Sequence, residues 1–200
     1  MKYTEILVDF TVDTQFSDIP EEALRVAREA TFDCIGVTLA GALEPCGKIG
    51  ADWARASAGA GVSTVWGHGF KTSPDHAALV NGTAAHALDY DDVTWGLVGH
   101  PSVSLVPATV ALGELIGASG KDVLQAYVIG FEVMAKIGRT VQPVHSLEGR
   151  WHATSTIGTF GATAACCRLL GLTKEQTGYA LGIAFSMSSG SVSHFGTMTK

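Results

Sequence analysis

One stretch near the start of the chain decides the fold class: "PEEALRVAREATFDCIGVTLA", residues 20–40. Its apolar side chains recur at roughly helical spacing and do not alternate with polar ones as in a strand. A proline and glutamates at its start and a glycine after its last apolar residue are typical helix boundaries. The apolar positions are Leu24, Ala27, Phe32, Ile35 and Leu39. The stretch therefore predicts a helix.

The same pattern continues outward along the chain. Ser73 and Pro74 predict the start of another helix, and Thr173 with Gln176 forms a capping-box signature. The β-prone piece "STVWG" is too short to found a sheet. The further helices are expected at residues 46–58, from 74 onward, and at 103–116, 121–140, 152–170 and 174–188. The sequence therefore predicts an all-α, multi-helix bundle.

Composition supports a well-packed domain. The chain has 200 residues, of which 46% are hydrophobic and 16% charged, and this is enough for a sizeable core. It also has 24 glycines, although each glycine inside a helix costs about 0.5–1 kcal/mol relative to alanine. In "TSTIGTFGATAACC" and "ALGIAFSMSSGS" the small residues recur at helical spacing. We therefore expect helices that pack backbone against backbone.

Charge and hydropathy exclude several classes of partner. Thirteen Lys and Arg against nineteen Asp and Glu give a net charge of −6, which repels nucleic acid and anionic membranes. Glu5, Asp9 and Asp13 interrupt the N-terminal stretch, unlike a signal peptide, and no run reaches the roughly 20 apolar residues of a membrane span. Four cysteines without CxxC spacing indicate reduced thiols and argue against an iron–sulfur cluster. We therefore expect a cytoplasmic protein.

Titratable side chains gather in one stretch, "HALDYDDVTWGLVGHPS", residues 86–102. If the preceding helix continues through it, His86, Asp89 and Asp92 share one face, which makes His86 and Asp92 candidates for substrate binding. His100 precedes the start of the next expected helix, where backbone N–H groups favour a carboxylate. Proton chemistry is one interpretation. A turn-and-cap cluster and a metal site are the alternatives, but no HExxH-type motif supports a metal.

Three ordered blocks resemble the successive signature blocks of the MmgE/PrpD family. They are "NGTAAHALDYDDVTWGLVGHPSVSLVPATVALGE", "WHATSTIGTFGATAACCRLLGLTKEQ" and "SGSVSHFGTMTK". The resemblance implies a large helical domain, a smaller α+β lid domain, a homodimer, and an active site between the domains without metal or other cofactor. Because members of the family are longer than this chain, we expect residues 1–200 to be the N-terminal portion of a single helical domain, with the lid outside it.

The resemblance also implies site residues. Asp89 matches the first aspartate of the family's D-[YF]-D-D block, and His100 matches the histidine of "HPS". His152 matches the histidine before the "GtfGAa" helix, and Lys200 matches the lysine of "MTK". These four are the expected catalytic residues. Thr94 is a further substrate-binding candidate, but the loop after "DYDD" is one residue longer than the family pattern.

The reaction that the resemblance implies is a metal-independent lyase reaction on a small polycarboxylate. Dehydration of a 2-methylcitrate-like substrate is expected ahead of decarboxylation of a cis-aconitate-like one or epimerisation of an iminodisuccinate-like one. His100, His152 and Lys200 would stabilise the developing negative charge, and an imidazole would exchange the proton. Asp89 would orient a histidine or act as a base. The non-enzymatic alternative is a helical module that keeps only a packing or dimer-forming surface.

Overall fold

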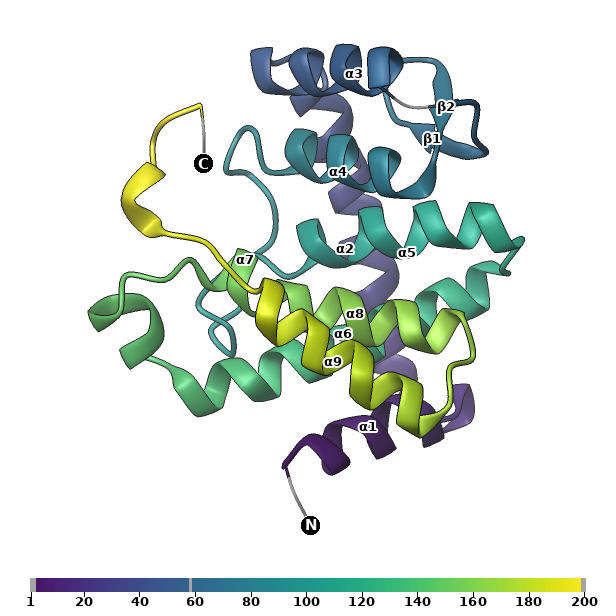
Figure 1. The fold of residues 1–200 in the computed structure, drawn as a ribbon, viewed down its shortest axis with the longest axis vertical. Coiled ribbons are helices and arrows are strands. Elements are labelled where there is room, and N and C mark those ends of the chain that lie inside the picture. The colour runs from purple at the N-terminus through teal and green to yellow at the C-terminus, as the bar shows by residue number, and fades with distance from the viewer. Residues whose placement is uncertain (1–2, 58, 199–200) are drawn as a thin grey trace.

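The computed structural model describes residues 3–57 and 59–198, and helices make up most of this part of the chain (Figure 1). The all-α prediction is confirmed. The helices are α1 (Tyr3–Asp13), α2 (Glu21–Gly41), α3 (Pro45–Ser57), α4 (Pro74–Ala85), α5 (Ser102–Ile116), α6 (Gly120–Val141), α7 (Ala153–Thr156), α8 (Gly158–Leu169) and α9 (Lys174–Met187). Two strands, β1 (Ser63–Val65) and β2 (Phe70–Thr72), and short helical turns at Phe16–Asp18, Val144–Glu148 and Val192–His194 complete the described elements.

Helix starts follow local chemistry where the sequence predicts it. The predicted capping box opens α9, because the Thr173 hydroxyl accepts a hydrogen bond from the Gln176 N–H at 3.2 Å. In return, the side-chain oxygen of Gln176 accepts one from the Thr173 N–H at 2.9 Å. These two bonds satisfy backbone donors that a helix start otherwise leaves unpaired.

Two expected helix boundaries are wrong. Helix α4 ends at Ala85, and beyond it Asp89 takes a left-handed backbone conformation with a φ of 52°, which no helix continues. The helix expected at 152–170 is interrupted at Ile157, which separates the four-residue α7 from α8. His152 therefore begins only one short turn, so a helix dipole gives no sound argument about its imidazole.

The sequence pattern does not predict α1, because Asp9 and Asp13 interrupt its apolar residues. In the structure the ammonium group of Lys174 lies 2.8 Å from the Asp9 carboxylate and 2.6 Å from the Asp13 carboxylate. Lys174 opens α9, and α1 packs against α9 and α8. Tertiary contact thus stabilises a helix whose own sequence signal is weak.

The β-prone piece "STVWG" pairs with a second short strand. β1 and β2 run antiparallel, with Ser63 opposite Thr72. The Asn81 side chain on α4 accepts a hydrogen bond from the Trp66 N–H and donates one to the Thr64 carbonyl, both at 2.9 Å. The hairpin therefore depends on a side chain of α4 for bonds that a third strand would supply.

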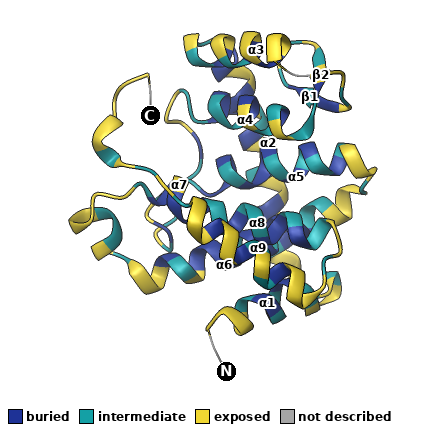
Figure 2. Cartoon of the chain, in the orientation of Figure 1, coloured by how far each residue is buried: buried dark blue, intermediate teal, exposed yellow. Residues whose placement is uncertain are grey.

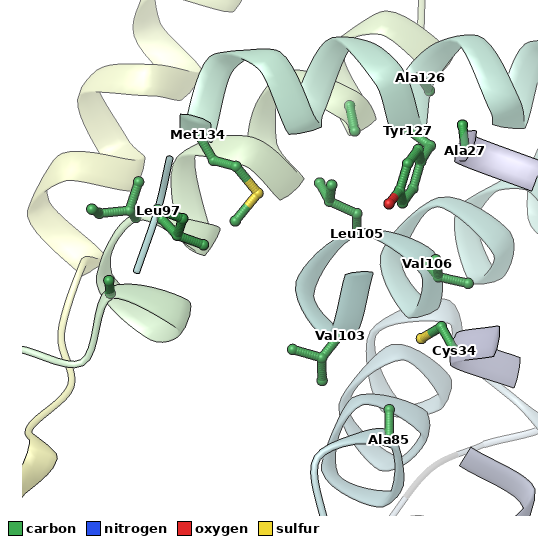
Figure 3. Packing of buried hydrophobic residues seen from close by; sticks show 13 residues of the cluster. Ala27, Cys34, Ala85, Leu97, Val103, Leu105, Val106, Ala126, Tyr127 and Met134 are labelled. Atoms are coloured by element: carbon green, nitrogen blue, oxygen red, sulfur yellow. The ribbon is translucent and has the colours of Figure 1, made fainter. Parts of the chain in front are cut away.

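The main core lies where α2, α5, α6 and α8 meet (Figure 3). Met134 and Tyr127 on α6 face Leu105 and Val106 on α5, and all four side chains are buried. Cys34 closes the cluster from α2. This shared core fixes the relative positions of the helix ends that carry the candidate site.

Helices α6 and α8 cross backbone against backbone, as the glycine pattern predicts. A Cβ atom on Gly130 would lie 2.6 Å from the Gly161 carbonyl oxygen and 2.7 Å from Leu105 Cδ2. A Cβ atom on Gly161 would lie 2.9 Å from the Gly130 carbonyl oxygen. No side chain fits at such distances, so the crossing requires glycine on both helices.

Several helices carry exposed residues on their outer faces (Figure 2), and large apolar side chains are among them. Helix α9 exposes Tyr179, Ile183, Phe185 and Met187, and α2 exposes Phe32, which is 82% exposed. In the described part of the chain, no helix combines the length and apolar character needed to cross a membrane.

Candidate active site

Residues 86–101 connect α4 to α5 and form a loop that we call the corner. Leu97 is fully buried and anchors the corner in the main core. The Thr94 N–H donates a hydrogen bond to the Gly99 carbonyl at 3.1 Å, which closes the loop around Leu97. The chain therefore returns toward the end of α4 before α5 begins.

Two imidazoles flank one buried carboxylate in the corner. The Asp91 side chain has no exposed surface, and its two oxygens lie 3.0 and 3.1 Å from His86 Nδ1. His100 Nδ1 lies 3.3 Å from the Asp91 carboxylate and 3.4 Å from the Asp91 carbonyl oxygen. The rings of His86 and His100 meet edge to face with their centroids 4.7 Å apart. We call these three residues the histidine–aspartate cluster.

Asp89 contacts this cluster from the solvent side. Its Oδ1 atom lies 3.5 Å from His100 Nε2, and its side chain is 61% exposed. His100 therefore lies between two carboxylates, Asp91 in the interior and Asp89 at the surface. The structure thus brings together the predicted residues Asp89 and His100.

His152 reaches the cluster from a distant part of the sequence. Its ring stacks on that of His86 at a centroid distance of 5.7 Å, and Phe195 meets its other side edge-on at 4.8 Å. The His152 N–H donates to the Gly190 carbonyl at 3.2 Å, so the segment after α9 lies against the start of α7 (Figure 1). The predicted residues His86, His100 and His152 are therefore neighbours.

Cavities open on both sides of His86. One, of about 480 Å³, is also lined by His152 and Ser104. Another, of about 440 Å³, is also lined by Asp89 and Met198. Both volumes lie in the range that small-molecule sites occupy. The cluster therefore borders spaces large enough for a small organic acid.

Asp92 turns away from the imidazoles. Its carboxylate accepts hydrogen bonds from the Ser102 N–H at 3.1 Å and the Ser102 hydroxyl at 2.7 Å. The Tyr127 hydroxyl lies 2.8 Å from the same serine oxygen. The start of α5, where the sequence predicts a ligand carboxylate, therefore holds the protein's own carboxylate. Asp92 borders neither cavity beside His86, so its geometry gives the predicted substrate contact no support.

Two further predicted residues remain without a place in this geometry. Thr94 closes the corner through its backbone, and its hydroxyl lies 3.4 Å from the Gly96 N–H. It borders neither cavity beside His86. Lys200 lies outside the described residues, although Met198 lines the cavity that Asp89 shares. The roles of Thr94 and Lys200 stay predictions.

The charges of the cluster are coupled. Burial favours the protonated form of Asp91, but its bonds and charge interactions with His100 and His86 outweigh burial and hold its pKa well below the usual range. Burial also disfavours the His100 imidazolium, but Asp91 and then Asp89 outweigh it and raise the pKa of His100. The cluster therefore favours an ionised Asp91 carboxylate and shifts His100 toward its protonated form.

The pKa of Asp92 shifts in the opposite direction to that of Asp91. Burial, together with the nearby charge of Asp91, raises the pKa of Asp92, and the bonds from Ser102 offset this only in part. The neighbouring carboxylates thus differ because only Asp91 has imidazole partners.

The cluster also has the residue types of a divalent-cation site. His86, Asp89, Asp91 and His100 each offer one atom, and these atoms lie within 4.8 Å of one another. The Asp91 carboxylate already faces both Nδ1 atoms, so a cation would have to replace these contacts. The sequence-based expectation of metal independence stays a prediction.

The sequence pattern assigns no role to Asp91. The helical face that the sequence predicts contains Asp89 and Asp92 but not Asp91. Because α4 ends before the corner, spacing along a helix does not apply there. If the stretch is treated as a loop, adjacent side chains can point in different directions, and Asp91 and Asp92 can then have different partners.

Comparison with known proteins places these features in a family. The profile described as the MmgE/PrpD N-terminal domain matches residues 5–200. Cis-aconitate decarboxylase from Homo sapiens is 30% identical over 187 residues, which are 91% of this chain and 39% of the human protein. The enzyme of that name from Mus musculus is 37% identical over 143 residues, 69% of this chain and 29% of the mouse protein. The one from Aspergillus terreus is 30% identical over 92% of this chain and 39% of its own length. The chain thus spans less than half of each relative.

Proposed function

The chain belongs to the MmgE/PrpD family, and from this premise we propose that it supplies the histidine and aspartate residues of a lyase site for a small polycarboxylate. The observation that carries the proposal is the pairing of His86 and His100 with one buried carboxylate, Asp91, and the stacking of His152 on His86, beside two cavities. Imidazoles in such a setting can bind a carboxylate and exchange a proton near neutral pH.

Decarboxylation of a cis-aconitate-like substrate is our first candidate reaction. The relatives above carry that activity in their names, whereas the sequence blocks alone favour dehydration. In the proposed reaction a bond from carbon to a carboxylate breaks, carbon dioxide leaves, and the electron pair stays on the substrate. The imidazolium of His100 or His152 then donates a proton to that carbon. A cationic imidazole also stabilises the negative charge before the proton arrives.

Dehydration of a 2-methylcitrate-like substrate is the second candidate. The corner is one residue longer than the family pattern, and Thr94 borders neither cavity beside His86, which supports a substrate other than cis-aconitate. In this reaction an imidazole removes a proton from the carbon beside a carboxylate, and a protonated imidazole gives a proton to the departing hydroxyl, which leaves as water. The same cluster supports both reactions, so the substrate decides between them.

The assembly that we propose is a homodimer without metal or other cofactor. The exposed apolar side chains of α9 and α2 support a covering surface, and a lid domain or a second subunit would supply it. The non-enzymatic alternative, a helical dimerisation module, uses the same surfaces but leaves the histidine–aspartate cluster without a task.

Turnover assays test the proposal. The protein should be expressed from its complete reading frame, so that any sequence beyond Lys200 is included, and offered cis-aconitate, 2-methylcitrate, citrate and iminodisuccinate. We expect cis-aconitate to be consumed at the same rate before and after exhaustive chelation. Activity that is lost on chelation and restored by one metal would overturn metal independence. A folded protein that turns over none of the four would favour the helical module.

A further inference from the structure

The hydrogen bonds of Asp91 determine where His86 carries its proton. An ionised carboxylate only accepts hydrogen bonds, and both Asp91 oxygens lie within 3.1 Å of His86 Nδ1. The hydrogen in this contact therefore belongs to the imidazole, and Nδ1 of His86 is the protonated nitrogen.

His100 obeys the same rule. Its Nδ1 atom faces the Asp91 carboxylate at 3.3 Å and the Asp91 carbonyl oxygen at 3.4 Å, and both groups can only accept. His100 is therefore also protonated at Nδ1. Its Nε2 atom faces the Asp89 carboxylate at 3.5 Å, which favours a second proton on this ring. One aspartate thus orients two rings.

The remaining nitrogen of His86 is the unusual atom. Nε2 is buried and has no hydrogen-bond partner within residues 3–57 and 59–198, and the side chain is only 10% exposed. Buried polar atoms in native proteins are nearly always paired, and an unpaired one needs an explanation. His86 lines both cavities at the cluster, so a molecule that occupies them can supply the partner.

We propose that Asp91 is a positioning residue that holds a proton on Nδ1 of both His86 and His100, and that Nε2 of His86, protonated when the substrate binds, donates a hydrogen bond to a carboxylate of the substrate. Each ring then turns its Nε2 atom away from Asp91, that of His100 toward Asp89 and that of His86 toward the space where the substrate would lie. The carboxyl contact rests on the proposed function, whereas the assignment of tautomers does not.

Nitrogen NMR tests the tautomers without any turnover. In protein labelled with ¹⁵N-histidine, two-bond correlations to the ring protons distinguish an Nδ1–H from an Nε2–H imidazole. We expect a proton on Nδ1 of both His86 and His100, seen either as the Nδ1–H pattern or as the doubly protonated pattern, and in neither ring the Nε2–H pattern. In Asp91→Asn the amide donates as well as accepts, so at least one ring should switch to Nε2–H. Unchanged tautomers in Asp91→Asn, or an Nε2–H pattern for His86 in the native protein, would overturn the positioning role.

Asp92→Asn is the matched control for Asp91→Asn. It alters the adjacent buried carboxylate, whose partner is Ser102 rather than a histidine. We expect it to lower the melting temperature and to leave both tautomers in place. Asp91→Asn should lower kcat/KM by roughly a hundredfold or more, because an imidazole in the wrong tautomer cannot exchange the proton. If Asp92→Asn changes the protonation of the two rings as much as Asp91→Asn does, Asp91 is not the residue that positions them.

The carboxyl contact is tested with cis-aconitate as the probe. His86→Gln should weaken its binding by about ten- to a hundredfold, the range for a hydrogen bond to a charged group. His76→Gln is the control, because His76 lies on the same helix, about 15 Å from His86 along its axis. Binding that His86→Gln leaves unchanged would overturn the contact. A native protein that binds no polycarboxylate would overturn the contact and the proposed function together, while the NMR result on the tautomers would still stand.

Discussion

The corner between α4 and α5 and the crossing of α6 over α8 both bury groups in the interior, but the buried groups are of opposite kinds. The crossing brings two helical backbones together over Gly130 and Gly161 and has no room for a side chain. The corner instead buries a carboxylate, Asp91, among imidazoles. In the crossing a substitution acts on packing, and in the corner it acts on charge and proton position. The comparison therefore separates residues that hold the fold from residues that carry chemistry.

The largest expected effect comes from the chemical side of the comparison. In protein expressed from its complete reading frame, His152→Gln should lower kcat/KM by at least roughly a hundredfold, the contribution of a general acid–base group. The melting temperature should stay near the native value, because His152 packs at the edge of a cavity. If His152→Gln lowers the melting temperature but leaves kcat/KM unchanged, His152 has a structural role. The acid–base role would then belong to His100 or Lys200.

Gly130→Ala tests the packing side. The added Cβ would meet the Gly161 carbonyl oxygen at 2.6 Å, so the helices must separate, at a cost of about 1–3 kcal/mol in the free energy of unfolding. Chemical denaturation measures this cost. The kcat/KM of the folded fraction should change little. A large loss of kcat/KM without loss of stability would show that the crossing and the corner are not separable.

A smaller effect is expected in the pH dependence of the free energy of unfolding, and it concerns the charges of the corner. The pKa of His100 is raised in the folded protein, so the protonated ring contributes stability that is fully present below the unfolded pKa of about 6.5. This contribution is lost as pH rises from there through the folded pKa. Denaturation midpoints of the native protein should therefore fall over this window more steeply than those of His100→Gln. Identical slopes would show that the cluster does not hold a proton on His100.

The smallest expected effect has the opposite sign. Gly36 lies inside α2, and a Cβ there would have no atom within 4 Å. Gly36→Ala should raise the free energy of unfolding by about 0.5–1 kcal/mol, because alanine favours the helix. Chemical denaturation of the native protein, Gly36→Ala and Gly130→Ala measures the free energy of unfolding of each. If both alanines destabilise the protein equally, close approach is not what separates the two glycines.

The sequence predicts much of the fold because helical periodicity and caps are local signals. The α9 capping box and the start of α2 come from a few adjacent residues. Helix α1 is missed because its support comes from Lys174, at the other end of the chain. Local patterns therefore predict elements whose stability is local and miss those that depend on distant contacts.

The candidate site shows the same limit. The residue types near His86 and His100 are visible in the sequence, and the family resemblance adds His152. Which aspartate meets which histidine depends on where α4 ends and on how buried Leu97 closes the corner. Helical spacing therefore favours Asp89 and Asp92 and passes over Asp91, the one carboxylate that contacts both His86 and His100.

The opposite orientations of Asp91 and Asp92 set a rule for insertions and deletions. Asp91 must contact the imidazoles and Asp92 must contact Ser102, so the two adjacent residues depend on different parts of the molecule. One residue gained or lost between His86 and Asp91 would move Asp91 away from His86 or Asp92 away from Ser102, and we expect it to break at least one of these sets of contacts. A residue gained after Asp92 only lengthens the loop that Leu97 anchors, and this is where Val93 stands. We therefore expect the protein to tolerate an inserted residue after Asp92 better than one between His86 and Asp91.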